Sequence, residues 1–161
     1  MTLAFIAPEP SSPPRFWAVI PCAGVGARAM AAGALEPSLP KQYQPLLGQP
    51  LVLHTLAAFA AVPQLAGTLV AVASGDDFLA AYPSSRYFTV PCGGPSRAQT
   101  VLGALRALLQ RGAQADDWVL VHDAARCLVT SLQIETLIAE CQHDSVGGLL
   151  AFFGQTYQTG A

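Results

Sequence analysis

The sequence FWAVIPCAGVGARA, residues 16 to 29, decides the fold of this chain. It begins with a continuous apolar run, which is typical of a strand buried on both faces of a sheet. The run leads into Gly24 and Gly26, and Arg28 follows. Glycine lets the backbone approach a phosphate closely, and the N–H groups of such a turn can bind an anion. The stretch therefore predicts a strand that delivers a glycine-rich turn to the phosphates of a nucleotide, with Arg28 acting on them.

The turn on its own leaves a second interpretation open. It lacks the GxxxxGK[ST] pattern of a P-loop, and it lacks the third glycine of GxGxxG. Two glycines can also form a tight strand-to-helix turn that binds nothing. The other motifs of the chain must decide between the two.

Composition excludes several classes of protein. The 161 residues suffice for one domain with a sizeable core, and 52% of them are apolar while only 11% are charged. Mean hydropathy is +0.41, yet no stretch reaches the roughly 18 uncharged apolar residues of a membrane-spanning helix. The apolar excess therefore indicates a heavily buried sheet. A net charge of −2 argues against nonspecific binding to nucleic acid or to an anionic membrane.

The four cysteines are scattered and form no CxxC pair, which argues against a zinc site. Reduced thiols in the cytoplasm are the expectation for such a set. The cysteines are Cys22, Cys92, Cys127 and Cys141.

Short apolar runs alternate with longer helical patterns along the chain. Strands are predicted over residues 16–23, 67–74, 86–92, 117–125 and 147–153. Helices are predicted over 49–62, starting near Pro50, over 97–112, ending at Gly112, and over 131–142, capped by Ser131. This alternation predicts an α/β fold, Rossmann-like, with a mostly parallel sheet flanked by helices. Right-handed crossovers then bring the carboxyl ends of the strands to one ligand-binding edge.

Three segments follow from these patterns. Residues 1–15 are rich in proline and serine and do not resemble a secretory signal, so we expect a disordered tail. Residues 16–151 form the predicted nucleotide-binding α/β domain, and 152–161 form a divergent tail. Inside the domain, residues 29–49 are irregular and contain three prolines, which favours a functional loop.

Arg28 and Lys41 are two of only eight basic residues. Arg28 ends the glycine turn and Lys41 lies in LPKQY, at the end of the irregular segment. Two cations that converge on one phosphate can stabilise the charge that develops during phosphoryl or nucleotidyl transfer. Two separate solvated surface charges are the alternative.

Asp123 follows an apolar strand in VLVHDAAR. A carboxylate at the carboxyl end of a strand lies on the ligand edge, where it can hold Mg²⁺ together with phosphate oxygens. His122 should face the opposite way and serve packing or a supporting hydrogen bond. Arg126 can pair with Asp123 or sit over the loop. A helix or turn cap is the alternative role for Asp123.

A further strand-to-helix junction lies in CGGPSRAQTV, residues 92–101. Gly93 and Gly94 end the strand, and the first helical turn carries Arg97 and Thr100. Helix N-termini attract anions, and a loop in this place can also read the edge of a base. An ordinary strand–turn–helix connection is the alternative.

Taken together and in this order, the motifs PCAGVGAR, PKQYQPLLGQPLVLHTL, GGPSRAQTV and VLVHDAAR carry a resemblance. From about residue 16 to about residue 150 the chain resembles the 2-C-methyl-D-erythritol 4-phosphate cytidylyltransferase family. The resemblance implies a fold of the nucleotide-diphospho-sugar transferase type. It implies transfer of CMP from CTP to 2-C-methyl-D-erythritol 4-phosphate, with Mg²⁺, giving CDP-methylerythritol and pyrophosphate in non-mevalonate isoprenoid biosynthesis.

The resemblance also implies roles for individual residues. The catalytic pair would be Arg28 and Lys41, which stabilise the pentacoordinate α-phosphate, and Asp123 would bind the metal. Gly94 and Thr100 would contact the cytosine. The full set of implied nucleotide-binding residues is Cys22, Ala23, Gly24, Gly26, Gly94, Arg97, Thr100, Asp123 and Ala124. The chain departs from the family pattern at Cys22, Ala29, Pro95 and Cys127.

The last ten residues, FFGQTYQTGA, do not resemble the family. In the family this region continues into the part that holds the polyol phosphate and a dimer arm. The resemblance implies a cytoplasmic homodimer, but the expected arm and the basic residues of the polyol-phosphate site are missing here. Three alternatives stay open: a non-catalytic nucleotide-binding protein, a cytidylyltransferase for another polyol phosphate such as ribitol phosphate, and a sugar nucleotidyltransferase that uses UTP or dTTP.

Overall fold

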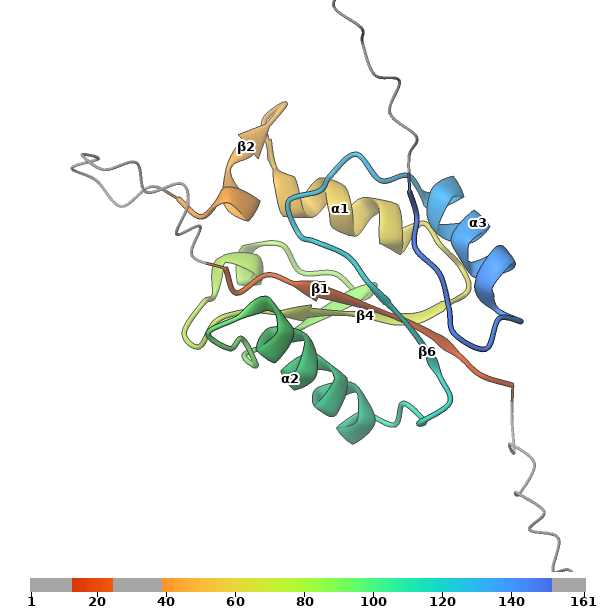
Figure 1. Ribbon diagram of the computed structural model, residues 1–161. Coiled ribbons are helices and arrows are strands. Elements are labelled where there is room, and N and C mark those ends of the chain that lie inside the picture. Colours follow the sequence, from red (N-terminus) through yellow and green to blue (C-terminus); the bar gives the residue numbers. More distant parts are fainter. Residues whose placement is uncertain (1–12, 25–38, 152–161) are drawn as a thin grey trace, which may run out of the picture.

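The computed structural model describes residues 13–24 and 39–151, which build a four-stranded parallel sheet (Figure 1). The spatial order of the strands is β5-β4-β1-β6, and each neighbouring pair is parallel. The strands are β1 (Phe16–Pro21), β4 (Leu65–Ala71), β5 (Tyr87–Val90) and β6 (Trp118–Val121). This arrangement confirms the predicted Rossmann-like α/β class.

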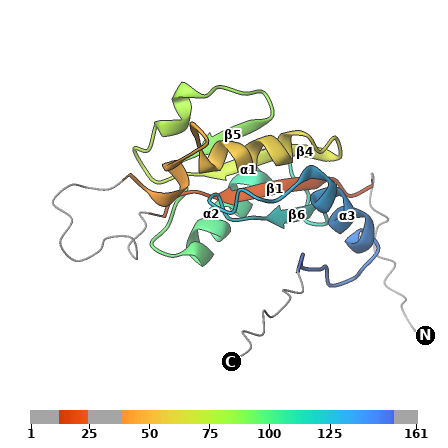
Figure 2. The same cartoon turned by 90° about the horizontal axis from the view of Figure 1, so that it is seen from above.

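Helices cover both faces of the sheet. Helix α2 (Arg97–Gln110) lies on one face, and α1 (Leu51–Ala60) and α3 (Ser131–Cys141) lie on the other (Figure 1). Viewed from above, α1 runs alongside β4 and β1 (Figure 2). Smaller elements complete the fold: the 3-10 turns η1 (Lys41–Tyr43) and η2 (Phe78–Ala81), and a hairpin of β2 (Pro45–Leu46) and β3 (Gln49–Pro50).

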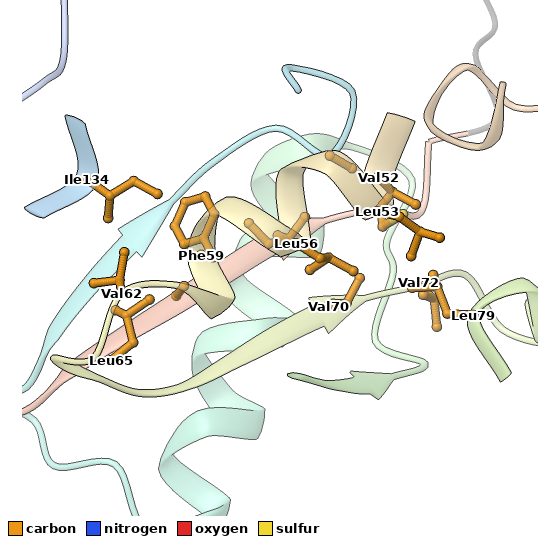
Figure 3. Close-up of a cluster of buried hydrophobic side chains, with 14 of the residues drawn as sticks. Val52, Leu53, Leu56, Phe59, Val62, Leu65, Val70, Val72, Leu79 and Ile134 are labelled. Carbon is orange, nitrogen blue, oxygen red and sulfur yellow. The ribbon is translucent and has the colours of Figure 1, made fainter. Parts of the chain in front are cut away.

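Strand β1 is buried on both sides because its side chains alternate between two apolar clusters. Trp17 and Val19 pack with α2, whereas Ala18 and Ile20 pack on the α1 side. The continuous apolar run at the start of the sequence thus reflects a strand with a helix layer on each face. Residues of α1, α3 and β4 fill the larger cluster, including Val52, Leu56, Phe59, Val70 and Ile134 (Figure 3).

The helix ends largely follow their sequence signals. Helix α1 begins directly after Pro50, and Gly112, with φ +92°, follows the end of α2. The prediction that Ser131 caps α3 is wrong by one residue. Thr130 is the cap: its hydroxyl accepts from the backbone N–H of Gln133, and the Gln133 side chain accepts from the N–H of Thr130. Such a reciprocal capping box satisfies two backbone donors, which a cap at Ser131 would leave unpaired.

The predicted strand over 147–153 is wrong for its described part, because residues 147–151 form no strand. The Asp144 carboxylate accepts from the N–H groups of Val146 and Gly147, and Gly147 has φ +100°. This turn directs the chain toward α3, so that Gly148 lies against Cys141. Among the described strands, β6 therefore has β1 as its single neighbour.

Asp117 holds the beginnings of β1 and β6 together. Its carboxylate accepts from the backbone N–H and the guanidinium of Arg15, from the indole Nε1 of Trp17 and from the N–H of Gln114, all at 2.8–2.9 Å. The side chain is 3% exposed. Burial raises the pKa of Asp117, but these donors outweigh burial and lower it to about 2.

No helix in the two described ranges is long and apolar enough to cross a membrane. The apolar excess of the sequence instead goes into the two clusters that sandwich the sheet.

Candidate functional site

Three groups of predicted site residues follow the carboxyl ends of the strands. Residues 22–24 follow β1, residues 91–96 follow β5, and residues 122–126 follow β6. Because the strands are parallel, these segments meet along one edge of the sheet. Asp76, which sequence reasoning did not select, lies in the loop after β4 at the same edge.

The first part of the edge joins the glycine turn to η1. The side-chain Nε2 of Gln42 donates to the carbonyls of Cys22 at 3.0 Å and of Gly24 at 2.9 Å. Gln42 is 7% exposed. Lys41, the residue before it, is the first residue of η1 and is exposed to solvent. Because Lys41 directly precedes Gln42, these bonds hold the backbone of Lys41 close to the turn, and a phosphate site shared by the two stays a prediction.

Tyr43 extends this connection to the loop after β4. Its hydroxyl donates to Oδ2 of Asp76 at 2.6 Å and accepts from the thiol of Cys22 at 3.6 Å. Its ring stacks on Phe78, with 4.0 Å between ring centroids. Burial, followed by the hydrogen bond to Asp76, raises the pKa of the Tyr43 hydroxyl well above its usual range. Burial likewise raises the pKa of the Cys22 thiol to about 12, although the hydrogen bond to Tyr43 acts in the opposite direction. Both groups therefore stay protonated and uncharged at neutral pH.

The loop after β5 packs directly on the glycine turn. A side chain at Gly93 would collide with Cβ of Ala23 and would lie 2.8 Å from the carbonyl oxygen of Val72. The N–H of the next residue, Gly94, donates to Oγ1 of Thr100 at 3.0 Å. Only a glycine at position 93 permits this close approach.

Thr100 is turned into the protein. Its hydroxyl donates to the carbonyl of Ser96 at 3.0 Å, and the residue is 3% exposed. In this structure the hydroxyl thus shapes the loop at Gly94. Direct contact of Thr100 with a cytosine stays a prediction.

Asp123 lies between two guanidinium groups. Oδ1 accepts a hydrogen bond from Nε of Arg97 at 2.8 Å, and Oδ2 forms an ion pair with Arg126, whose Nε lies 2.8 Å away. This confirms the predicted pairing of Arg126 with Asp123 and brings Arg97 to the same carboxylate. Burial alone raises the pKa of Asp123, but the hydrogen bond and charge of Arg97, with the charge of Arg126, bring the pKa below its usual value.

Neighbouring residues fix this loop. His122 packs against Phe59, with 5.5 Å between ring centroids, and its Nε2 lies 2.9 Å from the carbonyl oxygen of Arg126. This confirms its predicted packing and supporting role. Ala124 is buried, and its carbonyl accepts from the hydroxyl of Thr55 in α1 at 2.9 Å.

An open cleft of about 1250 Å³ begins at this cluster. Arg97, Asp123 and Arg126 line one end of it, and apolar residues of β6, α3 and residues 146–150 line the rest. Its apolar lining includes Leu137, Ile138 and Leu150. The cleft therefore combines a charged end at the sheet edge with a long apolar wall.

Two predicted residues, Gly26 and Arg28, lie outside the described residues. The structure brings together the other predicted segments through pairwise contacts: 22–24 with 41–43, Ala23 with Gly93, and Arg97 with Asp123. Sequence reasoning assigned no role to Gln42, Tyr43 or Asp76. Asp76 could have been found from the sequence, because it follows an apolar strand, as Asp123 does. Nothing in the sequence distinguishes Gln42 from its exposed neighbour Gln44.

Residues 16–153 match the sequence model of the family described as "IspD: 2-C-methyl-D-erythritol 4-phosphate cytidylyltransferase". One curated relative is the bifunctional enzyme IspD/IspF of Albidiferax ferrireducens, 56% identical over 146 residues, which are 89% of this chain and 34% of that protein. Another is the 2-C-methyl-D-erythritol 4-phosphate cytidylyltransferase of Bordetella pertussis, 47% identical over 136 residues. The match covers 83% of this chain and 58% of the Bordetella protein. The chain thus spans between a third and three fifths of the length of these relatives.

Solved structures agree with this assignment of the fold. The crystal structure of a 4-diphosphocytidyl-2C-methyl-D-erythritol synthase superimposes with a TM-score of 0.70 at 30% identity, over 87% of this chain and 60% of that one. A CMP:2-keto-3-deoxy-manno-octonic acid synthetase superimposes with a TM-score of 0.60 at 15% identity, over 82% of this chain and 49% of that one. The second likeness is one of fold alone.

Proposed function

Because this chain belongs to the 2-C-methyl-D-erythritol 4-phosphate cytidylyltransferase family, we propose that it forms the nucleotide-binding part of an enzyme that transfers CMP from CTP to 2-C-methyl-D-erythritol 4-phosphate. The phosphate oxygen of the acceptor attacks the α-phosphorus of CTP. The bond from that phosphorus to the bridging oxygen breaks, and pyrophosphate leaves. The products are CDP-methylerythritol and pyrophosphate, and the proposed location is the cytoplasm.

One observation carries this proposal: the glycine turn and Lys41 are fixed to each other through Gln42. An in-line displacement at phosphorus is accelerated mainly by positioning and by cations at the developing charge. Lys41 would supply the cation, and the hydrogen bonds of Gln42 to the turn would supply the positioning. We assign Arg28, which follows the same turn in sequence, as the second cation.

The remaining predicted residues receive supporting roles in the proposal. Ala23 and Gly24 would face the phosphates, with Gly26, while Cys22 lies beneath them. Gly94 and Thr100 would form the wall beside the base. Arg97 and Arg126 at the cleft would attract the anionic substrates, both of which carry phosphate groups.

Asp123 fits a magnesium site of the kind that nucleotides complete. Its side chain is 34% exposed, and although Oδ1 accepts a hydrogen bond from Arg97 and Oδ2 pairs with Arg126, both carboxylate oxygens keep lone pairs for a metal ion. Within residues 13–24 and 39–151, no three His, Cys, Asp or Glu side chains gather around a common point. Asp123 would therefore hold the ion with phosphate oxygens and water as its other ligands, and the bound ion would neutralise charge on the triphosphate.

The direct test is pyrophosphate release from CTP, Mg²⁺ and 2-C-methyl-D-erythritol 4-phosphate, with ribitol phosphate as the alternative acceptor. Release that depends on the methylerythritol phosphate supports the proposal. CTP binding without release would favour the non-catalytic nucleotide-binding alternative. Competition by UTP and dTTP gives the base preference, because a pocket that pairs with cytosine leaves polar groups unpaired when uracil or thymine enters. Sedimentation of the same sample measures whether it forms the family's dimer.

A further inference from the structure

We propose that Gln42 is a positioning residue that presents the nucleotide-binding turn at residues 22–24 to the triphosphate and holds it beside Lys41. The proposal rests on the function proposed above, since it assigns the part that aligns that site.

The side-chain amide of Gln42 spans the turn. Its Nε2 carries two protons, and its two acceptors are the carbonyl oxygens of Cys22 at 3.0 Å and Gly24 at 2.9 Å. These carbonyls are two residues apart, so a single side chain orients both ends of the turn. Gln42 is 7% exposed, and water competes little for these bonds.

The same bonds set the direction of the turn's donors. The carbonyl of Cys22 and the N–H of Ala23 belong to one trans peptide group, in which the two bonds point in opposite directions. Because the oxygen points to Gln42, the N–H of Ala23 points away from it. The side of the turn that faces away from η1 thus presents a backbone donor, which is the group that phosphate oxygens need.

Gln42 is itself firmly placed. Its neighbour Tyr43 stacks on Phe78 and donates to Asp76, and the N–H of Tyr43 donates to the carbonyl of Pro40 at 2.8 Å. The backbone of η1 is therefore held by contacts that do not involve the Gln42 side chain. Truncating that side chain should release the turn and leave η1, with Lys41, in place.

The experiment is titration calorimetry of the full chain with CTP and with cytidine, for the wild type, Gln42→Ala and Gln44→Ala. Gln44 is the matched control, because it is exposed and, among the described residues, its side chain makes one long hydrogen bond, 3.5 Å to the carbonyl of Leu39. For Gln42→Ala we expect CTP affinity to fall about tenfold while cytidine affinity changes less than twofold, because the phosphates meet the turn. Gln44→Ala should match the wild type for both ligands.

Gln42→Glu supplies a second readout that a merely structural role would not produce. A carboxylate has no proton to donate to the two carbonyl oxygens, whereas the protonated acid can donate one. Burial next to carbonyl oxygens raises the pKa of such an acid. Relative to the wild type at the same pH, CTP affinity of this variant should therefore recover as the pH is lowered from 8 to 5.

The outcomes separate the two proposals. If the wild type binds no CTP, the proposed function fails and the role of Gln42 fails with it. If the wild type binds CTP and Gln42→Ala binds it within twofold, or loses CTP and cytidine affinity equally, the role of Gln42 alone is overturned. Should Gln42→Ala not fold, the pH profile of Gln42→Glu decides, and a profile parallel to the wild type overturns the role.

Discussion

Nε of Arg97 donates a hydrogen bond of 2.8 Å to Oδ1 of Asp123, and this ion pair joins the first residue of α2 to the loop after β6. The guanidinium of Arg126 forms an ion pair with the second carboxylate oxygen, Oδ2. A carboxylate with two cationic neighbours binds a metal ion best after anionic phosphates have drawn those cations toward themselves. Under the proposed function, CTP and Mg²⁺ should therefore bind together.

Asp123→Asn should weaken Mg²⁺ binding in the presence of CTP by roughly tenfold or more, which corresponds to about 1.4 kcal/mol. The amide keeps the shape of the side chain but loses the charge that a hard cation requires. Calorimetric titration of Mg²⁺ into the CTP complex measures the effect without relying on turnover. An unchanged metal titration would show that Asp123 is not the ligand.

Arg97→Ala separates stability from function. Its side chain is 60% exposed, so loss of the ion pair should lower the free energy of unfolding by less than about 1 kcal/mol. If Arg97 contributes to the nucleotide site, CTP binding should fall several-fold in the same variant. Urea unfolding and CTP titration on one preparation give both numbers. Loss of stability without loss of binding would make the pair purely structural.

Lys41→Ala should reduce the rate of pyrophosphate release by about 10²–10³ while CTP affinity changes little, because the cation acts mainly on the transition state. Lys41 is exposed, so the melting temperature should stay the same. Arg28→Ala should behave in the same way. Arg106→Ala is the control, since Arg106 is an exposed cation in the middle of α2. Ordinary rates in both Lys41→Ala and Arg28→Ala would remove these two residues from the mechanism.

Two glycines of the site should respond differently to alanine. At Gly93 a Cβ collides with Ala23, so Gly93→Ala should cost about 1–3 kcal/mol of stability. At Gly24 the space for a Cβ is open among the described residues, so Gly24→Ala should change stability by less than about 1 kcal/mol. CTP binding should nevertheless weaken in Gly24→Ala, because the methyl group stands where a phosphate would approach. Equal CTP affinity of Gly24→Ala and the wild type would place the phosphates elsewhere.

Asp117 makes the stability of the fold depend on acid pH. Its pKa is lowered from 3.8 to about 2 in the folded state, so its stabilisation is complete above pH 4 and is lost as the pH falls from about 4 to 2. Asp117→Asn should lower the free energy of unfolding at pH 7 by about 2–3 kcal/mol. It should also flatten the pH dependence between pH 4 and 2. Urea denaturation across this range tests both effects, and an unchanged slope would assign the acid sensitivity to other carboxylates.

Local patterns were sufficient to predict the sheet and its helices, because a strand that is buried on both faces appears in the sequence as a continuous apolar run. The paired strands β4, β1 and β6 coincide with such runs, which contain Leu69, Val19 and Val119. Where a boundary depends on one side chain, the pattern misses by a residue, as Thr130 and Ser131 show. A strand also needs a neighbour, which the apolar run at 147–153 does not specify by itself.

The candidate site was predictable at strand ends and less so between them. Asp123 stands out because a polar residue follows an apolar strand. Tyr43 and Asp76 lie 33 positions apart and meet only through the fold, so no local spacing joins them. The brace formed by Gln42 is equally non-local, since its amide reaches residues 18 and 20 positions earlier.

Cys22 gives the molecule an internal reporter of motion at the turn. Cys22 is 1% exposed, and its thiol is hydrogen bonded to Tyr43 and has a pKa raised to about 12, so an alkylating reagent has almost no thiolate to attack. Labelling of Cys22 must therefore wait for a local opening that uncovers the sulfur. In a variant with the three other cysteines replaced, the labelling rates of Cys22 with and without CTP would report how strongly the nucleotide suppresses local opening of the turn.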